Sequence, residues 1–236
     1  MPQSADCGIY YNIMDVVFKN KKIVIVKKPV GIPTQSDLTG DSDLMSLLSA
    51  ELAAAGEPSA LWLVHRLDRV VGGLVVFART KKAAAQLSEM TGGNGMLKEY
   101  LAVVEGDADG GVMEDYIFKD SAKGKAFVVP GERRGAKRAS LEYEAIAKCE
   151  TERGVRSLVR IRLHTGRFHQ IRVQFASRGM SLSGDGKYGS HDNRAKTPAL
   201  FAARLCFSLD GDGVTATATP PTEEYPWSLF DKECFK

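Results

Sequence analysis

The stretch HRLDRVVGGLVVFA, residues 65–78, places a carboxylate between two arginines directly ahead of an apolar run. The run at residues 74–78 is short and rich in β-branched side chains, which predicts a buried strand. Two glycines before it predict a bend. Asp68 is therefore either a turn residue that pairs with its neighbours or a catalytic carboxylate that Arg66 or Arg69 keeps ionised. Taken alone, the charged tetrapeptide favours a surface turn.

Patterns along the rest of the chain predict more strands than helices. Strands are expected at 23–26, 98–106, 140–148 and 158–163, with a hairpin joining 206–209 to 214–219 around Asp210-Gly211-Asp212-Gly213. Helices are expected at 43–55 with Ser42 or Asp43 as the cap, at 81–90 with Thr80 as the cap, at 168–178 and at 199–205. Because strands seldom alternate regularly with helices, the pattern favours an α+β fold with a mostly antiparallel sheet over a doubly wound fold.

Composition limits the classes of protein and partner. The 236 residues are 44% hydrophobic and 26% charged, which is ordinary for a globular protein with a substantial core. The net charge is only +3, but residues 119–172 carry 14 Lys and Arg against 6 Asp and Glu, an excess of 8. The rest of the chain is therefore net acidic. Such a concentrated positive region favours a polyanionic partner, and a solvated basic face is the alternative.

The cysteines and the N-terminus point to the cytoplasm. Cys7, Cys149, Cys206 and Cys234 are too far apart in sequence to form a metal-binding knuckle. The first residues, MPQSADCG, lack the basic start and apolar core of a secretory signal. No apolar run approaches the roughly 20 residues of a membrane span. We therefore expect a cytoplasmic protein with reduced thiols, no metal and no membrane partner.

A second cluster of polar residues lies at 163–172, LHTGRFHQIR, which packs two His, two Arg, one Gln and one Thr into ten positions. These side chains are the donors that contact phosphate, ribose and base edges in RNA complexes. Thr165 and Gly166 are expected to start a helix whose first amides attract an anion. The alternative is a capped helix with solvated charges.

A third cluster is the glycine-rich loop GDGKYG at 184–189. Glycine lets a backbone approach a ligand closely, but the loop lacks the spacing of the known nucleotide-phosphate motifs. Taken alone, it is better explained as a tight turn.

Together these motifs resemble the RluA type of pseudouridine synthase. The family pattern HRLD-x-x-T-S-G-L matches residues 65–74, K-x-Y-x-A-x-V-x-G matches 98–106, T-G-R-x-H-Q-I-R-V matches 165–173, and G-D-x-x-Y-G matches 184–189, all in the family's order. Lys28-Pro29-x-Gly31-x-Pro33 resembles the family's start, and residues 201–205, FAARL, resemble its closing helix. The resemblance spans roughly residues 20 to 221.

The resemblance implies a reaction and a fold. These enzymes break the bond from ribose to a uracil nitrogen in RNA, turn the base and rejoin it through carbon, with no metal or organic cofactor. The implied architecture is the pseudouridine synthase fold, a mixed and mostly antiparallel sheet flanked by helices around a central RNA-binding cleft. We expect residues 1–236 to form one catalytic domain. Only about 20 residues precede the first family strand, so no separate N-terminal RNA-binding domain is expected. A monomer is expected.

The resemblance also implies roles for particular residues. Asp68 is the catalytic carboxylate, as a nucleophile or as a base; Tyr100 stacks on the target base and helps to remove the proton from carbon 5; Arg172 pairs with Asp68. RNA binding is expected from His65, Arg66, Arg69, Arg167, His169, Gln170 and Lys187, with Arg66 filling the gap left by a flipped uridine. As alternatives, Tyr100 is a core residue, and Arg167 and Gln170 only brace their loop or contact phosphates.

Departures from the family pattern leave other functions open. Val71 and Gly72 stand where the family usually has Thr-Ser, which removes two hydroxyls from the loop of Asp68. One alternative function is therefore an RNA-binding protein of the same fold that has lost the chemistry. Another is a hydrolase that uses Asp68 with a second acid, for which Asp185 is the candidate. The sequence does not distinguish transfer RNA from ribosomal RNA.

Overall fold

The computed structural model describes residues 14–37, 39–93 and 95–235. Its α-helices there are α1 (Leu44–Ala54), α2 (Lys81–Gly92) and α3 (Gln170–Ala176). Its strands are β1 (Asp15–Lys19), β2 (Ile23–Lys28), β3 (Trp62–Leu63), β4 (Gly72–Ala78), β5 (Met96–Glu105), β6 (Gly110–Asp120), β7 (Lys125–Val129), β8 (Ala136–Thr151), β9 (Gly154–Leu163), β10 (Leu200–Leu209) and β11 (Asp212–Thr217). None of the described helices is long and apolar enough to cross a membrane.

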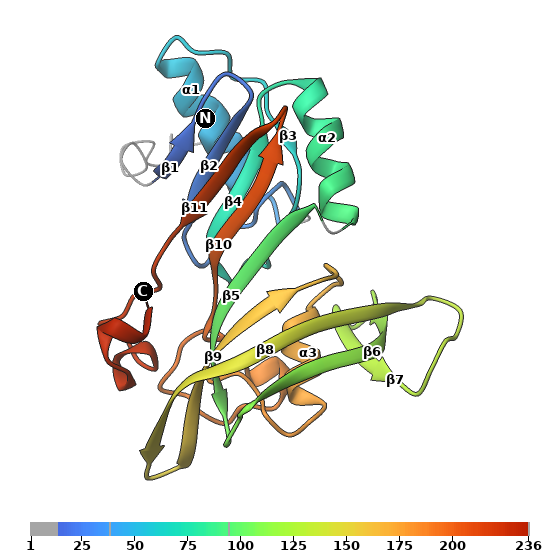
Figure 1. Ribbon diagram of the computed structural model, residues 1–236, viewed down its shortest axis with the longest axis vertical. Helices are drawn as coiled ribbons and strands as arrows, with labels where there is room; N and C mark the ends of the chain where they lie inside the picture. The colour runs from blue at the N-terminus through green and yellow to red at the C-terminus, as the bar shows by residue number, and fades with distance from the viewer. Residues whose placement is uncertain (1–13, 38, 94, 236) are drawn as a thin grey trace, which may run out of the picture.

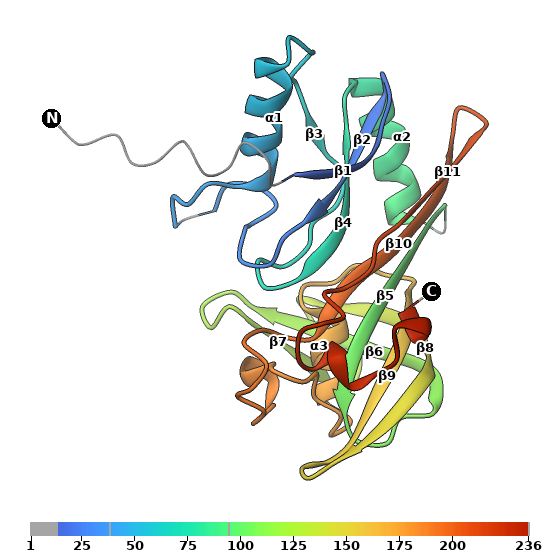
Figure 2. The same ribbon diagram turned by 90° about the vertical axis from the view of Figure 1, so that its left-hand side faces the viewer.

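The strands form one mixed sheet in the order β1-β2-β4-β10-β5-β9-β8-β6-β7, with β11 beside β10 and β3 beside β4. Figure 1 and Figure 2 show the long strands β5 and β10 running between a part with α1 and α2 and a part with α3. All described strand pairs are antiparallel except β4 with β10, which meet in parallel at two residue pairs. The α+β fold with a mostly antiparallel sheet is confirmed.

Strand β4 is buried along its whole length because both of its faces are covered. Val75 and Phe77 pack in the same cluster as the apolar face of α1, and Leu74 and Val76 pack in the cluster that contains α2. Neighbouring side chains of a strand point to opposite faces, so a strand covered on both sides needs an unbroken apolar run. Each such side chain contributes roughly 1.5–3 kcal/mol of burial free energy. The run at the end of HRLDRVVGGLVVFA is therefore a rigid support for the loop before it.

The two faces of β5 separate the pocket side from the opposite side. Tyr100 and Ala102 share a core cluster with Phe175 of α3. Leu101 and Val103 instead pack against the C-terminal segment around Trp227. Side chains of β5 that belong to the Tyr100 face therefore point toward α3.

Local sequence signals located two helices and one turn correctly. The Asp43 carboxylate caps α1 by accepting a hydrogen bond from the Ser46 amide at 3.0 Å, and the Thr80 hydroxyl caps α2 through the Ala83 amide at 3.2 Å. The predicted hairpin is confirmed, since Leu209 pairs with Asp212 across Asp210-Gly211.

Two predictions about helices are wrong. Residues 199–205 are not a helix: from Leu200 they form β10, which lies between β4 and β5 and whose first three residues are all buried. A short apolar run has the same pattern in a buried helix and a buried strand. The helix expected at 168–178 is shorter, because His169 adopts a left-handed conformation (φ 53°) and α3 starts only at Gln170. Thr165 therefore does not start it.

Gly73 permits the close contact of β4 with β10. Its φ is +114°, and a Cβ atom would lie 2.3 Å from the Ala202 carbonyl oxygen and 2.5 Å from the Ala202 nitrogen. We predict that Gly73→Ala lowers the free energy of unfolding by roughly 3 kcal/mol or more, since the strands must separate. Gly213→Ala, which meets no atom within 4 Å, is the control. Equal losses in chemical denaturation for both variants would contradict this account.

His65 ties the loop of Asp68 to β4. Its Nε2 accepts a hydrogen bond from the Val76 amide at 3.2 Å, and burial together with the nearby Lys98 charge lowers its pKa to about 4. The unfolded chain binds a proton on this imidazole near pH 6.5. The stability from neutral His65 is therefore complete above that pH and is lost as the pH falls toward 4.

We predict a pH-dependent stability that a glutamine at position 65 reduces. Between pH 7 and pH 5 the wild type should lose about 2 kcal/mol more unfolding free energy than His65→Gln, because an amide oxygen accepts the same hydrogen bond without titrating. Denaturant melts at the two pH values test this. The same pH dependence in both proteins would show that His65 does not cause it.

Candidate active site

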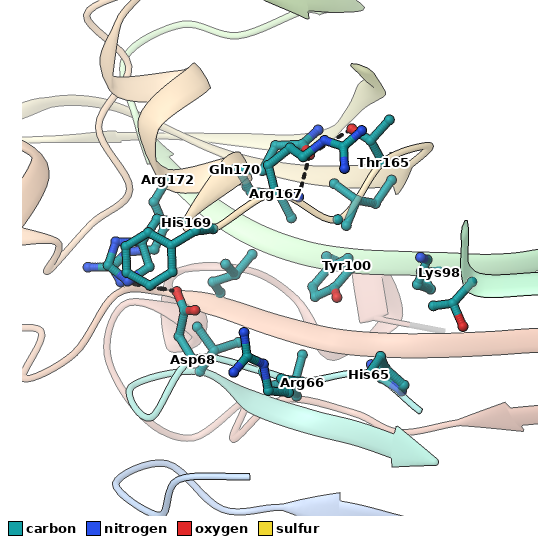
Figure 3. Close-up of a pocket in the computed structure, with 18 of the residues that line it drawn as sticks. His65, Arg66, Asp68, Lys98, Tyr100, Thr165, Arg167, His169, Gln170 and Arg172 are labelled. Atoms are coloured by element: carbon teal, nitrogen blue, oxygen red, sulfur yellow. Dashed lines mark hydrogen bonds and ion pairs between the residues drawn. The ribbon is translucent and has the colours of Figure 1, made fainter. Parts of the chain in front are cut away.

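A pocket of about 500 Å³ is lined by the loop before β4, by strand β5 and by residues 163–172 (Figure 3). It brings together residues from three of the sequence motifs. The predicted residues that line it are Asp68, Tyr100, Arg172, His65, Arg66, Arg167, His169 and Gln170, whereas Arg69 and Lys187 do not.

The loop of Asp68 is held by hydrogen bonds on both sides of the carboxylate. The Thr34 hydroxyl accepts from the Leu67 amide at 3.1 Å and lies 3.0 Å from the Leu67 carbonyl oxygen. The buried Lys28 ammonium donates to the carbonyl oxygens of Ile32 and Arg69, at 2.7 and 3.2 Å. Burial lowers the pKa of Lys28 to about 8. These contacts hold a loop in which Val71 and Gly72 supply no hydroxyl.

Arg172 joins two carboxylates from different parts of the chain. Its Nη1 donates to Asp68 at 3.1 Å, while Nε and Nη2 form two hydrogen bonds to Asp185, at 2.7 and 2.8 Å. Burial raises the pKa of Asp68, and the Arg172 charge opposes this by favouring the ionised form. Because Asp185 binds two of the three guanidinium nitrogens, the third, Nη1, is directed at Asp68.

Neither arginine beside Asp68 in sequence is its main partner. Arg69 pairs with Asp37 and Asp41, at 3.0 and 2.5 Å, so the expectation that Arg69 keeps Asp68 ionised is wrong. Arg66 is exposed and adds only a weaker charge effect on the Asp68 pKa. The partner that the fold supplies is 104 positions away in sequence.

Tyr100 lies on β5, buried, and forms part of both the core and the pocket wall. Burial and the negative charge of Asp68 both raise the pKa of its hydroxyl. The side chain is therefore a protonated phenol at neutral pH.

His169 contacts Asp68 as a neutral ring. Its Nε2 lies 3.6 Å from the carboxylate, and its Nδ1 lies 2.8 Å from the Tyr188 hydroxyl, which accepts a hydrogen bond from the Ala126 amide of β7. Burial, with the charges of Arg172 and Lys187, lowers the pKa of His169 to about 3. Arg172 is therefore the cation in direct contact with Asp68.

The other predicted RNA-binding residues occupy different environments. Gln170 is buried and braces its loop, accepting from the Thr165 hydroxyl and the Arg167 amide and donating to the Ser140 carbonyl. Arg167 is exposed and donates to the Arg138 carbonyl at 2.8 Å. Lys187 is exposed on the short 3-10 helix Gly186–Tyr188.

Asp185, for which the sequence predicted only a turn or a second acid, instead pairs with Arg172. The sequence signal for this ion pair was the position of Asp185 in the motif at 184–189, which directly follows the motif at 165–173 that contains Arg172. Both of its oxygens bind Arg172, and it does not line the pocket, which argues against the hydrolase alternative. Lys119, the first residue of the predicted basic region, also lines the pocket, with its ammonium 4.6 Å from the Phe168 ring centre. Among the described residues, no three His, Cys, Asp or Glu side chains gather as a metal site would require.

Comparison with known proteins places these residues in a family. The family described as RNA pseudouridylate synthase matches residues 22–177, more than half of the chain. An uncharacterised RNA pseudouridine synthase of Bacillus subtilis is 32% identical over 83% of this chain and 64% of its own length, and one of Zymomonas mobilis is 33% identical over 87% and 93%. The ribosomal large subunit pseudouridine synthase C of Escherichia coli is 28% identical over 89% and 66%. The chain thus spans less than two thirds of the first and third of these relatives.

The fold agrees with this assignment. The solved structure of human RNA pseudouridylate synthase domain containing 4 superposes with a TM-score of 0.71 at 23% identity, covering 88% of each chain. The RluA-type resemblance of the motifs is confirmed by relatives named as ribosomal large subunit pseudouridine synthases C and D. The chain therefore belongs to the RNA pseudouridylate synthase family, whose members are isomerases that convert uridine in RNA to pseudouridine.

Proposed function

We propose that this chain isomerises uridine to pseudouridine in structured RNA, transfer or ribosomal, with Asp68 as the catalytic carboxylate. The observation that carries the proposal is the ion pair of the half-buried Asp68 with the buried Arg172, in a pocket that Tyr100 also lines. An ionised carboxylate held in place by a shared guanidinium suits a nucleophile or a base, since both need the charged form.

The reaction assigns a task to each of the three side chains. Asp68 attacks the substrate or takes a proton from the ribose while the bond from C1′ to N1 breaks. The uracil then turns, and C5 bonds to C1′ as Asp68 breaks its own bond to the substrate or returns the ribose proton. The C5 proton leaves and N1 takes up a proton. The ring of Tyr100 supports the base during this turn. Arg172 keeps Asp68 charged and aimed throughout.

Exposed cations around the pocket supply the grip on RNA. Arg66, Arg167 and Lys119 line the pocket from its exposed side, and Lys187 lies nearby. Such charges contact phosphates and make binding salt-dependent. The target uridine must leave the base stack to reach Asp68, and we expect the exposed Arg66 to fill the gap. Action as a single-domain monomer in the cytoplasm, without metal or organic cofactor, belongs to the same proposal and rests on the resemblance.

We predict that the wild type releases tritium from RNA labelled at C5 of uridine and that Asp68→Asn does not. The expected loss in rate is about 1000-fold or more, because the amide is neither a nucleophile nor a base. Asp210→Asn is the matched control: Asp210 lies in the β10–β11 turn with φ 54°, which asparagine tolerates. Total transfer and ribosomal RNA from a strain that lacks the gene serve as substrates.

Three outcomes of this assay separate the alternatives. Release by the wild type and the control alone supports the isomerase and the role of Asp68. Tight, salt-sensitive RNA binding without release by any protein would favour the binding protein. Equal release by wild type and Asp68→Asn would remove Asp68 from the chemistry.

We predict that replacing Arg172 changes the pH dependence of the activity. Replacing Arg172 by glutamine removes the charge that favours ionised Asp68, so the carboxyl pKa must rise. Activity requires the ionised form, and the acidic limb of the kcat/KM profile should therefore move to higher pH. Arg172→Lys keeps the charge and should move the limb less. An unchanged limb in Arg172→Gln would show that this pair does not set the ionisation.

A further inference from the structure

Lys98 is a buried lysine that the proposed chemistry does not yet use. It lies on β5 two residues before Tyr100, on the same face of the strand, and lines the pocket with only 5% of its surface exposed. Figure 3 shows Tyr100 between Asp68 and Lys98. The pocket therefore has a carboxylate and a guanidinium at one end and an isolated ammonium at the other.

Within the described part of the chain, no salt bridge or hydrogen bond holds the Lys98 ammonium. Its neighbour His65 offers no acceptor: Nε2 already accepts from the Val76 amide, and in the neutral ring the other nitrogen carries the proton. Burial without an anion beside it disfavours the charged form of this ammonium and lowers its pKa. The simplest explanation for a lysine in this position is a ligand that accepts a hydrogen bond from its ammonium.

We propose that the Lys98 ammonium binds a carbonyl oxygen of the target uracil and stabilises the negative charge that the ring acquires when the C1′–N1 bond breaks. This inference rests on the proposed function and assigns a further catalytic residue to the same site.

The base, and not a phosphate, is the group that fits this place. A phosphodiester carries a sugar on each side and so stays at the entrance, where Arg66 and Arg167 are exposed. A flipped base is a terminal group and reaches a buried side chain. Residues two apart on a strand face are separated by about 6.6 Å. With the ribose at Asp68 and the ring on Tyr100, the carbonyl edge of the uracil is directed toward Lys98.

The electrons of the reaction explain the need for a cation. When C1′–N1 breaks, the bonding pair stays on N1 and is shared with O2 and O4 of the ring. Asp68 meanwhile bonds to C1′ or takes a ribose proton. C5 then bonds to C1′ with an electron pair of the ring, which makes the ring neutral, while the Asp68–C1′ bond breaks or the ribose proton returns. The C5 proton then leaves and N1 takes up a proton, so the ring stays neutral. An ammonium at a carbonyl oxygen stabilises the charged stage more than the neutral substrate, which lowers the barrier.

The test compares Lys98→Met with the wild type in single- and multiple-turnover tritium release. Methionine keeps the length of the side chain and removes the charge. We expect kcat to fall about 100- to 1000-fold, as when an oxyanion donor is removed, while KM, RNA affinity and its salt dependence stay close to wild type. Lys98→Arg should recover part of kcat. Lys82→Met, an exposed lysine on α2, is the control with unchanged activity.

Stability provides a second readout. Removal of an unpaired buried charge should leave the melting temperature equal or higher, whereas removal of a structural residue lowers it. A lower kcat with an equal or higher melting temperature supports the proposal.

Other outcomes overturn it. The first is a kcat of Lys98→Met within about threefold of wild type. The second is weaker RNA binding, with a salt slope reduced by about one and kcat unchanged, which marks a phosphate contact. The third is a much lower melting temperature of Lys98→Met that Lys98→Arg does not restore. Absence of tritium release from the wild type itself would instead overturn the proposed function, and this inference with it.

Discussion

The sharing of one guanidinium by two carboxylates is the contact on which the site depends. Asp185 holds Arg172 through two hydrogen bonds, and Arg172 holds Asp68 through one. Three segments therefore have to meet: the loop before β4, helix α3 and the glycine-rich loop at 184–189. Breaking such a buried pair from one side leaves an uncompensated charge, which destabilises by several kcal/mol. The geometry of the site therefore depends on how these three segments pack, and their packing depends on the ion pairs of the site.

Rigid elements on either side keep that contact in place. Strand β4, covered by α1 and α2, supports the end of the loop of Asp68, and Thr34 and Lys28 hold its backbone. Left-handed His169 ends the preceding loop and lets α3 begin where Arg172 faces the carboxylate. The family's usual hydroxyls at positions 71 and 72 are absent, and the loop is held from the neighbouring segment instead. Position 72 has little room, since a Cβ atom would lie 3.3 Å from Val30.

Sequence patterns correctly predicted the features that depend only on neighbouring residues, such as helix caps and tight turns. Caps predicted the starts of α1 and α2, and the Asp-Gly turn predicted the hairpin. Local patterns did not predict strand β10, because its apolar run becomes a strand only through pairing with β4 and β5. They also did not predict β1, β6 or β7, which are partly exposed edge or near-edge strands with weak alternation. Ordered motifs named Asp68, Tyr100 and Arg172, but nearness in sequence suggested Arg69 as a partner, and no local pattern marks Lys98 as unpaired.

The hydrogen bond from the Ala126 amide to the Tyr188 hydroxyl has a mechanical consequence. Ala126 belongs to the β6–β7 hairpin, and the same hydroxyl meets His169, which contacts Asp68. Lys119 of β6 also rests on Phe168, whose ring stacks on His169 at 3.8 Å. Because both links end at the same imidazole, the hairpin cannot swing relative to α3 without turning that ring. A displacement of the outer hairpin is therefore transmitted through His169 to the Asp68 carboxylate.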